Sequence, residues 1–228
     1  MFSSGRILVL DGAMGTMIQR SGFTGDNESL NLSDPDLIEG IHRAYIEAGA
    51  DIIETNTFGA NRLSQGEYSL AGAAREMALE GARIARRAAS SAPRKILVAG
   101  SVGPTPKSLS LAVDASDPSR REVSFDEMVS VYDEQIGALL EGGVDLILIE
   151  TCFDALNAKA ALYALSKLSP GFPAVVSVSL AGGRTLTGQS IEAFYTAVSH
   201  YPLAAFGLNC SMGAADMLPL LKEVARFE

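Results

Sequence analysis

The stretch that decides the fold is GVDLILIET, residues 143–151. It runs from a glycine that can end a helix, through an aspartate and four consecutive aliphatic residues, to Glu150 and Thr151. A shorter version, GADIIET, stands at residues 49–55. Uninterrupted aliphatic runs of this length are typical of strands in a parallel sheet that is covered on both faces. The two copies therefore predict repeated units in which a buried parallel strand ends in polar residues.

Apolar runs of strand length recur along the chain and alternate with segments that have helical spacing. Ser33 offers a hydroxyl N-cap before Pro35, and Ser124 and Glu127 form a capping box. No linker-like tract divides the units, so we expect one domain. The predicted strands are residues 7–10, 52–53, 96–99, 146–149, 174–178 and 204–208, and the predicted helices are 33–49, 71–89, 124–142, 154–168, 190–200 and 215–226.

This alternation predicts an α/β fold of the TIM (β/α)8-type barrel, whose active sites lie at the carboxyl ends of the strands. An open, doubly wound sheet also alternates strand and helix and binds ligands at the same edge. Against the open sheet, no glycine-rich G-x-G-x-x-G loop follows the first predicted strand.

The composition is that of an acidic globular protein. Its 228 residues carry 18 Lys and Arg against 27 Asp and Glu, a net charge of −9, which argues against nucleic acid or an anionic membrane as a partner. No apolar run reaches the roughly 18 residues of a membrane span, and the first residues lack the apolar core of a signal peptide. Two cysteines, Cys152 and Cys210, are too few for a disulfide framework. We therefore expect a soluble, cytoplasmic protein.

Polar residues follow each predicted strand and would converge at one end of a barrel. Together they offer carboxylates, amides, hydroxyls and one thiol, a set that could recognise a small zwitterion beside a soft metal. They are Asp11-Gly12, Glu54-Thr55-Asn56, the loop 101–105, Glu150-Thr151, Ser179 and Asn209-Cys210.

Each candidate also has a structural interpretation. Asp11 before Gly12 is compatible with a simple turn. The carboxylates of Glu54 and Glu150 at strand ends are compatible with structural ion pairs to arginine. A free cysteine such as Cys210 is most often a small buried apolar residue. Cys152 is expected to be a packing residue. His42 and His200 lack metal-ligand spacing, so we expect surface or capping roles for them.

The motifs, taken in order, resemble the homocysteine S-methyltransferase family. The likeness covers essentially the whole chain and is nearest to the N-terminal homocysteine-binding module of cobalamin-dependent methionine synthases. The matching stretches are LDGAMGTMIQ (10–19), AGADIIETNTF (48–58), GSVGPT (100–105), DLILIET (145–151), DALNAKA (154–160) and GLNC (207–210).

The resemblance implies a TIM barrel that binds zinc through three cysteine thiolates, one after the sixth strand and an adjacent pair after the eighth. Cys210 matches the first of these ligands. By the same matching, Glu150 would hold the amino group of homocysteine, and Asp11 with the Gly12 backbone would lie in the homocysteine pocket. Asn209 and Thr151 would be near neighbours in that pocket.

The activity that the resemblance implies is zinc-dependent methyl transfer to the sulfur of homocysteine, giving methionine. The expected donor is methylcobalamin or methyltetrahydrofolate, with the cobalamin- and folate-binding modules on other segments or another chain. Alternatives are a methyltransferase that uses S-methylmethionine or betaine, or an inactive amino-acid-binding or assembly fragment of the same fold.

Two features depart from the family pattern. The paired cysteines are absent, and eight units at the observed spacing would need roughly 300 residues. We therefore expect residues 1–228 to form a homocysteine-binding domain that is incomplete at its C-terminus, with six of eight units. Such a truncated barrel would bind zinc weakly as a monomer, because one cysteine cannot hold the ion. Its open edges would favour self-association.

Overall fold

A computed structural model describes residues 5–226. Residues 1–4 and 227–228, the two ends of the predicted domain, lie outside the described residues. The chain divides into two compact units, and each is described by itself. The first unit contains the residues up to Val102 together with Glu134–Ile147, and the second contains Gly103–Asp133 and the residues from Leu148 on.

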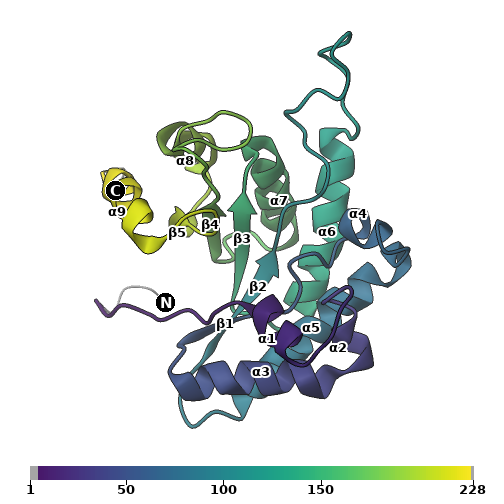
Figure 1. The fold of residues 1–228 in the computed structure, drawn as a ribbon, viewed down its shortest axis with the longest axis vertical. Helices are drawn as coiled ribbons and strands as arrows, with labels where there is room; N and C mark the ends of the chain where they lie inside the picture. The colour runs from purple at the N-terminus through teal and green to yellow at the C-terminus, as the bar shows by residue number, and fades with distance from the viewer. Residues whose placement is uncertain (1–4, 227–228) are drawn as a thin grey trace. The chain divides into compact units, whose positions relative to one another are not determined.

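The structure confirms an α/β fold with a parallel sheet. The strands follow chain order, β1-β2-β3-β4-β5 (Figure 1). The elements are α1 (Met14–Arg20), α2 (Leu30–Ser33), α3 (Pro35–Ala48), β1 (Ile52–Glu54), α4 (Arg62–Gly66), the 3-10 helix η1 (Ala71–Ala73), α5 (Ala74–Ser90), β2 (Leu97–Val102), α6 (Phe125–Glu141), β3 (Leu146–Cys152), α7 (Ala155–Leu168), β4 (Ala174–Val178), α8 (Ile191–Val198), β5 (Leu203–Leu208) and α9 (Ala214–Val224).

The first predicted strand, residues 7–10, is not a strand in the structure. Leu10 forms only an isolated parallel bridge to Ile52, supported by a hydrogen bond from Asp11 N to Ile52 O at 3.0 Å. The side chain of Ile7 is 88% exposed. The apolar character of residues 7–10 could not predict their exposure, because it does not show whether other segments of the protein cover them. Within residues 5–226 the sheet therefore has five strands where the sequence predicts six.

The aspartate of the repeated motif ties the start of each copy to the neighbouring backbone. Asp51 Oδ2 accepts a hydrogen bond from Val9 N at 3.0 Å, and Asp145 Oδ2 accepts one from Val98 N at 2.8 Å. Asp51 also pairs with Arg6, and this hydrogen bond, with the one from Val9 N, lowers the pKa of its carboxyl. Each aspartate thus accepts a hydrogen bond from a backbone N–H of the neighbouring segment, and so helps to set the register between the two segments.

Helix ends follow the sequence signals with one correction. The N-cap of α3 is Asp34, whose side chain accepts from Leu37 N, and not Ser33, which ends α2. The predicted capping box before α6 is confirmed: Glu127 Oε2 accepts from Ser124 N at 2.8 Å, and Ser124 Oγ accepts from Glu127 N at 3.2 Å.

In the first unit, α3 packs against α5 (Figure 1). The core there is aliphatic and includes Ile38, Ile41 and Ile84. His42 belongs to the same buried region and is fully buried, so the expected surface or capping role was wrong. Its position explains this, because it lies four residues after Ile38 and four before Ile46 on the inner face of α3.

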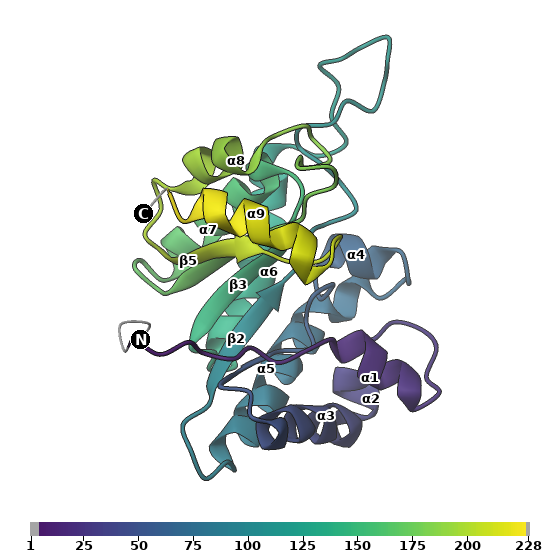
Figure 2. The same ribbon diagram turned by 60° about the vertical axis from the view of Figure 1, so that its left-hand side comes forward.

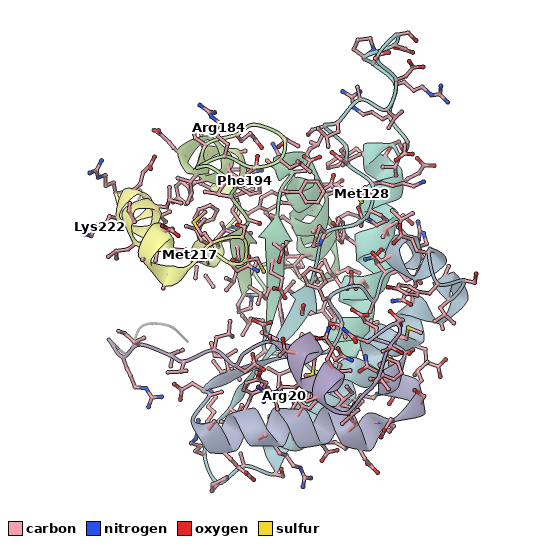
Figure 3. The ribbon with its side chains drawn as sticks, viewed as in Figure 1. Arg20, Met128, Arg184, Phe194, Met217 and Lys222 are labelled. Carbon is pink, nitrogen blue, oxygen red and sulfur yellow. The ribbon has the colours of Figure 1, made fainter. Side chains whose placement is uncertain are left out.

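In the second unit, β4 and β5 pair in parallel, and α9 lies alongside β5 (Figure 2). Phe194 of α8 is fully buried, and its ring centroid lies 6.4 Å from that of Phe206 on β5 (Figure 3). Tyr195 packs edge-on against Phe206 at 5.1 Å. This aromatic cluster attaches α8 to the sheet. No helix within residues 5–226 has the length and apolar character needed to cross a membrane.

The first prediction concerns Gly81 in the middle of α5. A Cβ there would lie 2.6 Å from Asn31 Nδ2 and 2.6 Å from Thr57 Cγ2. Asn31 Nδ2 cannot move freely, because it donates to the carbonyl oxygens of Asn56 and Met77. We expect Gly81→Ala to lower the free energy of unfolding by about 1–3 kcal/mol through overpacking, measured by chemical denaturation.

The matched control is Gly40→Ala in α3. Within the described residues a Cβ at Gly40 meets nothing within 4 Å. Alanine is a better helix former than glycine, so the free energy of unfolding of this variant should rise by up to about 1 kcal/mol. Equal stability of the two variants would contradict the close packing at Gly81.

The second prediction concerns His42. Neither ring nitrogen has a hydrogen-bond partner among the described residues. Burial lowers its pKa to about 4, against a small opposing effect of the Glu39 charge. The folded state therefore binds the proton less well than the unfolded chain, and the stability present above pH 6.5 is lost as the pH falls toward 4. We expect the titration of His42 to lower the free energy of unfolding by about 2 kcal/mol between pH 7.5 and pH 5.

The measurement is the free energy of unfolding against pH for the wild type and for His42→Leu. The variant lacks the titrating ring, so its curve should be flatter by that amount. Parallel curves would show that His42 is not a buried neutral imidazole.

Candidate functional site

The carboxyl ends of β3 and β5 carry the main group of candidate residues. Glu150 and Thr151 lie near the end of β3, and Asn209 and Cys210 follow β5 directly. Parallel pairing brings these ends together: Ser179 N donates to Cys152 O at 3.0 Å, and Asn209 N donates to Val178 O at 3.2 Å. All four predicted residues belong to the second unit.

The side-chain amide of Asn209 connects these residues. Its Oδ1 accepts hydrogen bonds from Thr151 N at 2.9 Å and from Ser177 Oγ at 2.8 Å. Its Nδ2 lies 2.8 Å from Thr151 Oγ1, 3.3 Å from Glu150 Oε2 and 3.5 Å from Cys210 Sγ, and donates to them. Because Thr151 N can only donate, the amide oxygen must face it. The amide orientation is therefore determined, and it directs the NH2 group toward the carboxylate and the sulfur.

The backbone of this site is held in an uncommon conformation. Thr151, Cys210 and Ser211 have φ angles of 55°, 57° and 59°, in the left-handed region that non-glycine residues rarely adopt. A β-branched residue such as Thr151 is especially unfavourable there. Strain of this kind costs on the order of 1–3 kcal/mol per residue and persists where the surroundings enforce it. The bond from Thr151 N to Asn209 and the bond from Ser211 Oγ to Leu180 O provide that enforcement.

The two cysteines have opposite environments. Cys210 is exposed, which excludes the alternative interpretation of it as a buried apolar residue. Cys152 is buried, as predicted, and its Sγ lies 3.5 Å from Ile149 O. Burial raises the pKa of the Cys152 thiol, with a further contribution from the Glu150 charge. Cys210 is therefore the accessible thiol of the chain, and it lies beside Asn209 and Thr151.

The zinc ligands that the resemblance implies can be tested on these residues. Zinc in such a site needs three protein ligands and one open position. Residues 5–226 contain no group of three or more His, Cys, Asp or Glu side chains that could hold a metal ion. Cys210 has the right chemistry, but the neighbours that its sulfur contacts, Asn209 and Thr151, are neutral. The described residues alone do not fit the ion.

Asp11 and Gly12 belong to the first unit. Asp11 Oδ2 accepts a hydrogen bond from Glu54 N at 3.0 Å, so its carboxylate is fixed at the end of β1 and the segment is not a simple turn. A Cβ on Gly12 would lie 3.0 Å from the Tyr45 ring, which explains the glycine. Burial and the Asp11 charge raise the pKa of Tyr45. Asp11 and Gly12 thus belong to a different unit from Asn209 and its hydrogen-bond partners.

Other predicted strand-end residues lie in buried polar contacts of the first unit. The hydroxyls of Thr55 and Thr57 are 2.6 Å apart, and Ser101 N donates to Thr55 Oγ1 at 3.0 Å. These contacts hold the loop after β1. In the second unit, the sequence analysis gives Ser179 as the candidate after this strand, whereas the serine that contacts Asn209 is Ser177. Two-residue periodicity puts both serines on one face of the strand and would have identified Ser177 as a candidate.

Solved structures show where this fold has been seen. The chain is 24% identical to the homocysteine methyltransferase MmuM from Escherichia coli in its metallated form, with a TM-score of 0.81, over 97% of this chain and 80% of that chain. The apo form matches with a TM-score of 0.76 over 98% and 79%, and the oxidized form with 0.77 over 96% and 78%, both at 24% identity. These likenesses support the fold.

The sequence of the chain matches a family model over nearly its whole length. The model is described as homocysteine S-methyltransferase and matches residues 8–228. This protein therefore belongs to the homocysteine S-methyltransferase family.

Proposed function

We propose that this protein transfers a methyl group to the sulfur of homocysteine and so forms methionine. The observation that carries the proposal is the cluster around Asn209. In a chain of this family, a carboxylate and an accessible thiol lie beside one amide, at the carboxyl ends of two parallel strands. That edge is where α/β proteins place their ligand sites.

Glu150 is the proposed binding group for the substrate's ammonium. Asn209 Nδ2 donates to Glu150 Oε2 at 3.3 Å, which helps to keep the carboxylate in one position. A charge-assisted hydrogen bond to an ammonium is among the stronger polar contacts. Asp11 and the Gly12 backbone are proposed as further homocysteine-binding groups, and Thr151 and Asn209 as pocket residues. Their role is to position the amino acid, with no acid–base step assigned to them.

The reaction is a nucleophilic substitution at a methyl carbon. The substrate thiol loses its proton, a sulfur–carbon bond forms, and the bond between the methyl group and the donor breaks. A free alkyl thiol has a pKa near 8.5, so little thiolate is present at neutral pH and the sulfur needs activation. The proposed donor is methylcobalamin or methyltetrahydrofolate, bound by modules elsewhere. S-methylmethionine or betaine is the alternative donor within the same activity.

Cys210 is the proposed contribution of this chain to a zinc site. Soft thiolate ligands suit zinc. Because Cys152 is buried and residues 5–226 hold no other suitable group, the further ligands of such a site would come from outside these residues. A non-catalytic amino-acid-binding or assembly role is the second candidate. The observation that favours it is this lack of a complete ligand set among the described residues.

The third prediction concerns Glu150→Gln. The substitution keeps the size and an acceptor for Asn209 Nδ2 but removes the charge that would pair with the ammonium. Loss of one charge-assisted hydrogen bond should raise the KM for homocysteine about 10- to 100-fold. The measurement is methionine formation by mass spectrometry, with added zinc and each of the named donors in turn.

Glu192→Gln is the matched control for this variant, because Glu192 is an exposed residue in the first turn of α8. It should leave KM unchanged. If Glu150→Gln and Glu192→Gln had the same kinetics, the proposed role of Glu150 in binding homocysteine would be contradicted. Homocysteine binding without methionine formation from any donor would favour the non-catalytic candidate.

The fourth prediction concerns zinc. We expect the chain on its own to retain well under one zinc per chain after dialysis, because it offers one accessible thiol. Metal analysis by mass spectrometry measures the content, and a thiol reagent counts the accessible cysteines. One thiol should react quickly in the native protein and both in denaturant, and Cys210→Ser should abolish the fast reaction. One tightly held zinc per chain would contradict this prediction.

A further inference from the structure

We propose that Ser177 is a positioning residue, which holds the Asn209 amide in place and, through it, the Glu150 carboxylate that receives the substrate's ammonium. The inference rests on the proposed function for the role of Glu150. The hydrogen bonds that carry it lie within the second unit.

The first step is the environment of Ser177. It is a buried residue of β4, 8% exposed, and stands between Val176 and Val178, which are fully buried. A hydroxyl in such a place is costly unless it is hydrogen-bonded. Its bond is to Asn209 Oδ1 at 2.8 Å. An alanine would fit the strand equally well, so packing does not explain the serine.

The second step is the donor and acceptor pattern of the amide. Asn209 Oδ1 receives two donors, Ser177 Oγ and Thr151 N. With the amide rotated by 180°, the NH2 group would face these two donors, and the carbonyl oxygen would face the carboxylate of Glu150. The contacts with Thr151 N and with Glu150 would then be unfavourable, because a donor would face a donor and an acceptor would face an anion, whereas the Ser177 hydroxyl can also accept a hydrogen bond. Thr151 N and Glu150 thus set which way the amide faces, and the Ser177 hydroxyl holds its oxygen in place by a further hydrogen bond.

The third step leads from the amide to the substrate. In the preferred orientation Asn209 Nδ2 donates to Glu150 Oε2 at 3.3 Å and to Thr151 Oγ1 at 2.8 Å. Ser177 therefore acts on Glu150 through Asn209. A ligand with an ammonium should depend on this arrangement, and the same ligand without the ammonium should not.

The experiment compares the binding of homocysteine and 4-mercaptobutyrate, which is homocysteine without its amino group. The wild type should prefer homocysteine, and Glu150→Gln should abolish the preference. Ser177→Ala should reduce it roughly three- to tenfold, the effect of one neutral hydrogen bond. Ser177→Thr, which keeps the hydroxyl, should restore it. Ser166→Ala, which loses a hydroxyl bond of 2.8 Å to Tyr163 O on α7, should leave the preference unchanged.

A double-mutant cycle tests the route through Asn209. In the Asn209→Ala background, Ser177→Ala should have no further effect on the preference, because the amide that it holds in place is gone. Additive effects of the two substitutions would overturn the inference. So would equal weakening of both ligands in Ser177→Ala, which indicates a merely structural role.

The two proposals fail in distinguishable ways. If the wild type does not prefer homocysteine, or if Glu150→Gln keeps the preference, the proposed function of Glu150 fails. If both behave as expected and Ser177→Ala matches the wild type, the present inference fails alone.

Without ligand, NMR of the Asn209 side-chain amide gives a separate test. Ser177→Ala should shift its signals and speed their hydrogen exchange, and unchanged signals would overturn the positioning role.

Discussion

The site around β3 and β5 depends on one constraint: Thr151 N can only donate, so the Asn209 amide turns its oxygen toward Thr151 N and its NH2 group to the other side. Thr151 N and Ser177 Oγ occupy the oxygen, so the NH2 group is directed toward Thr151 Oγ1, Glu150 and Cys210. A single neutral side chain thereby links two strand ends and β4. In a half-buried site such hydrogen bonds are stronger than in water, and a misplaced amide would be correspondingly costly.

The same constraint accounts for the uncommon backbone of the site. The positive φ of Thr151 is a local cost, and the hydrogen bond from its N–H to Asn209 helps to offset it. Cys210 and Ser211 carry the same cost on the β5 side, where the hydroxyl of Ser211 bonds to Leu180 O. The two strand ends that meet at the Asn209 amide thus share the same kind of backbone strain, which persists only where the surroundings enforce it.

Much of the fold could be predicted from the sequence because local signals and burial agreed. Residues 174–178 form β4 as predicted, and the capping box of Ser124 and Glu127 is present. The errors came where tertiary context decided. Residues 7–10 have the apolar character of a strand but pair only through Leu10. The prediction of a surface or capping role for His42 was wrong because His42 lies on the inner face of α3, which the absence of metal-ligand spacing does not reveal.

The candidate site was predictable to the level of residue type, and the geometry was not. Motif order identified Glu150, Thr151, Asn209 and Cys210, which the structure brings together, whereas the bonds of Ser177 require three-dimensional proximity. One accessible thiol cannot hold zinc by itself, but the amide beside it is fully engaged in orienting a carboxylate. Under the proposed function, the described residues would bind and position the amino acid, and the ligands that complete a zinc site would come from outside residues 5–226.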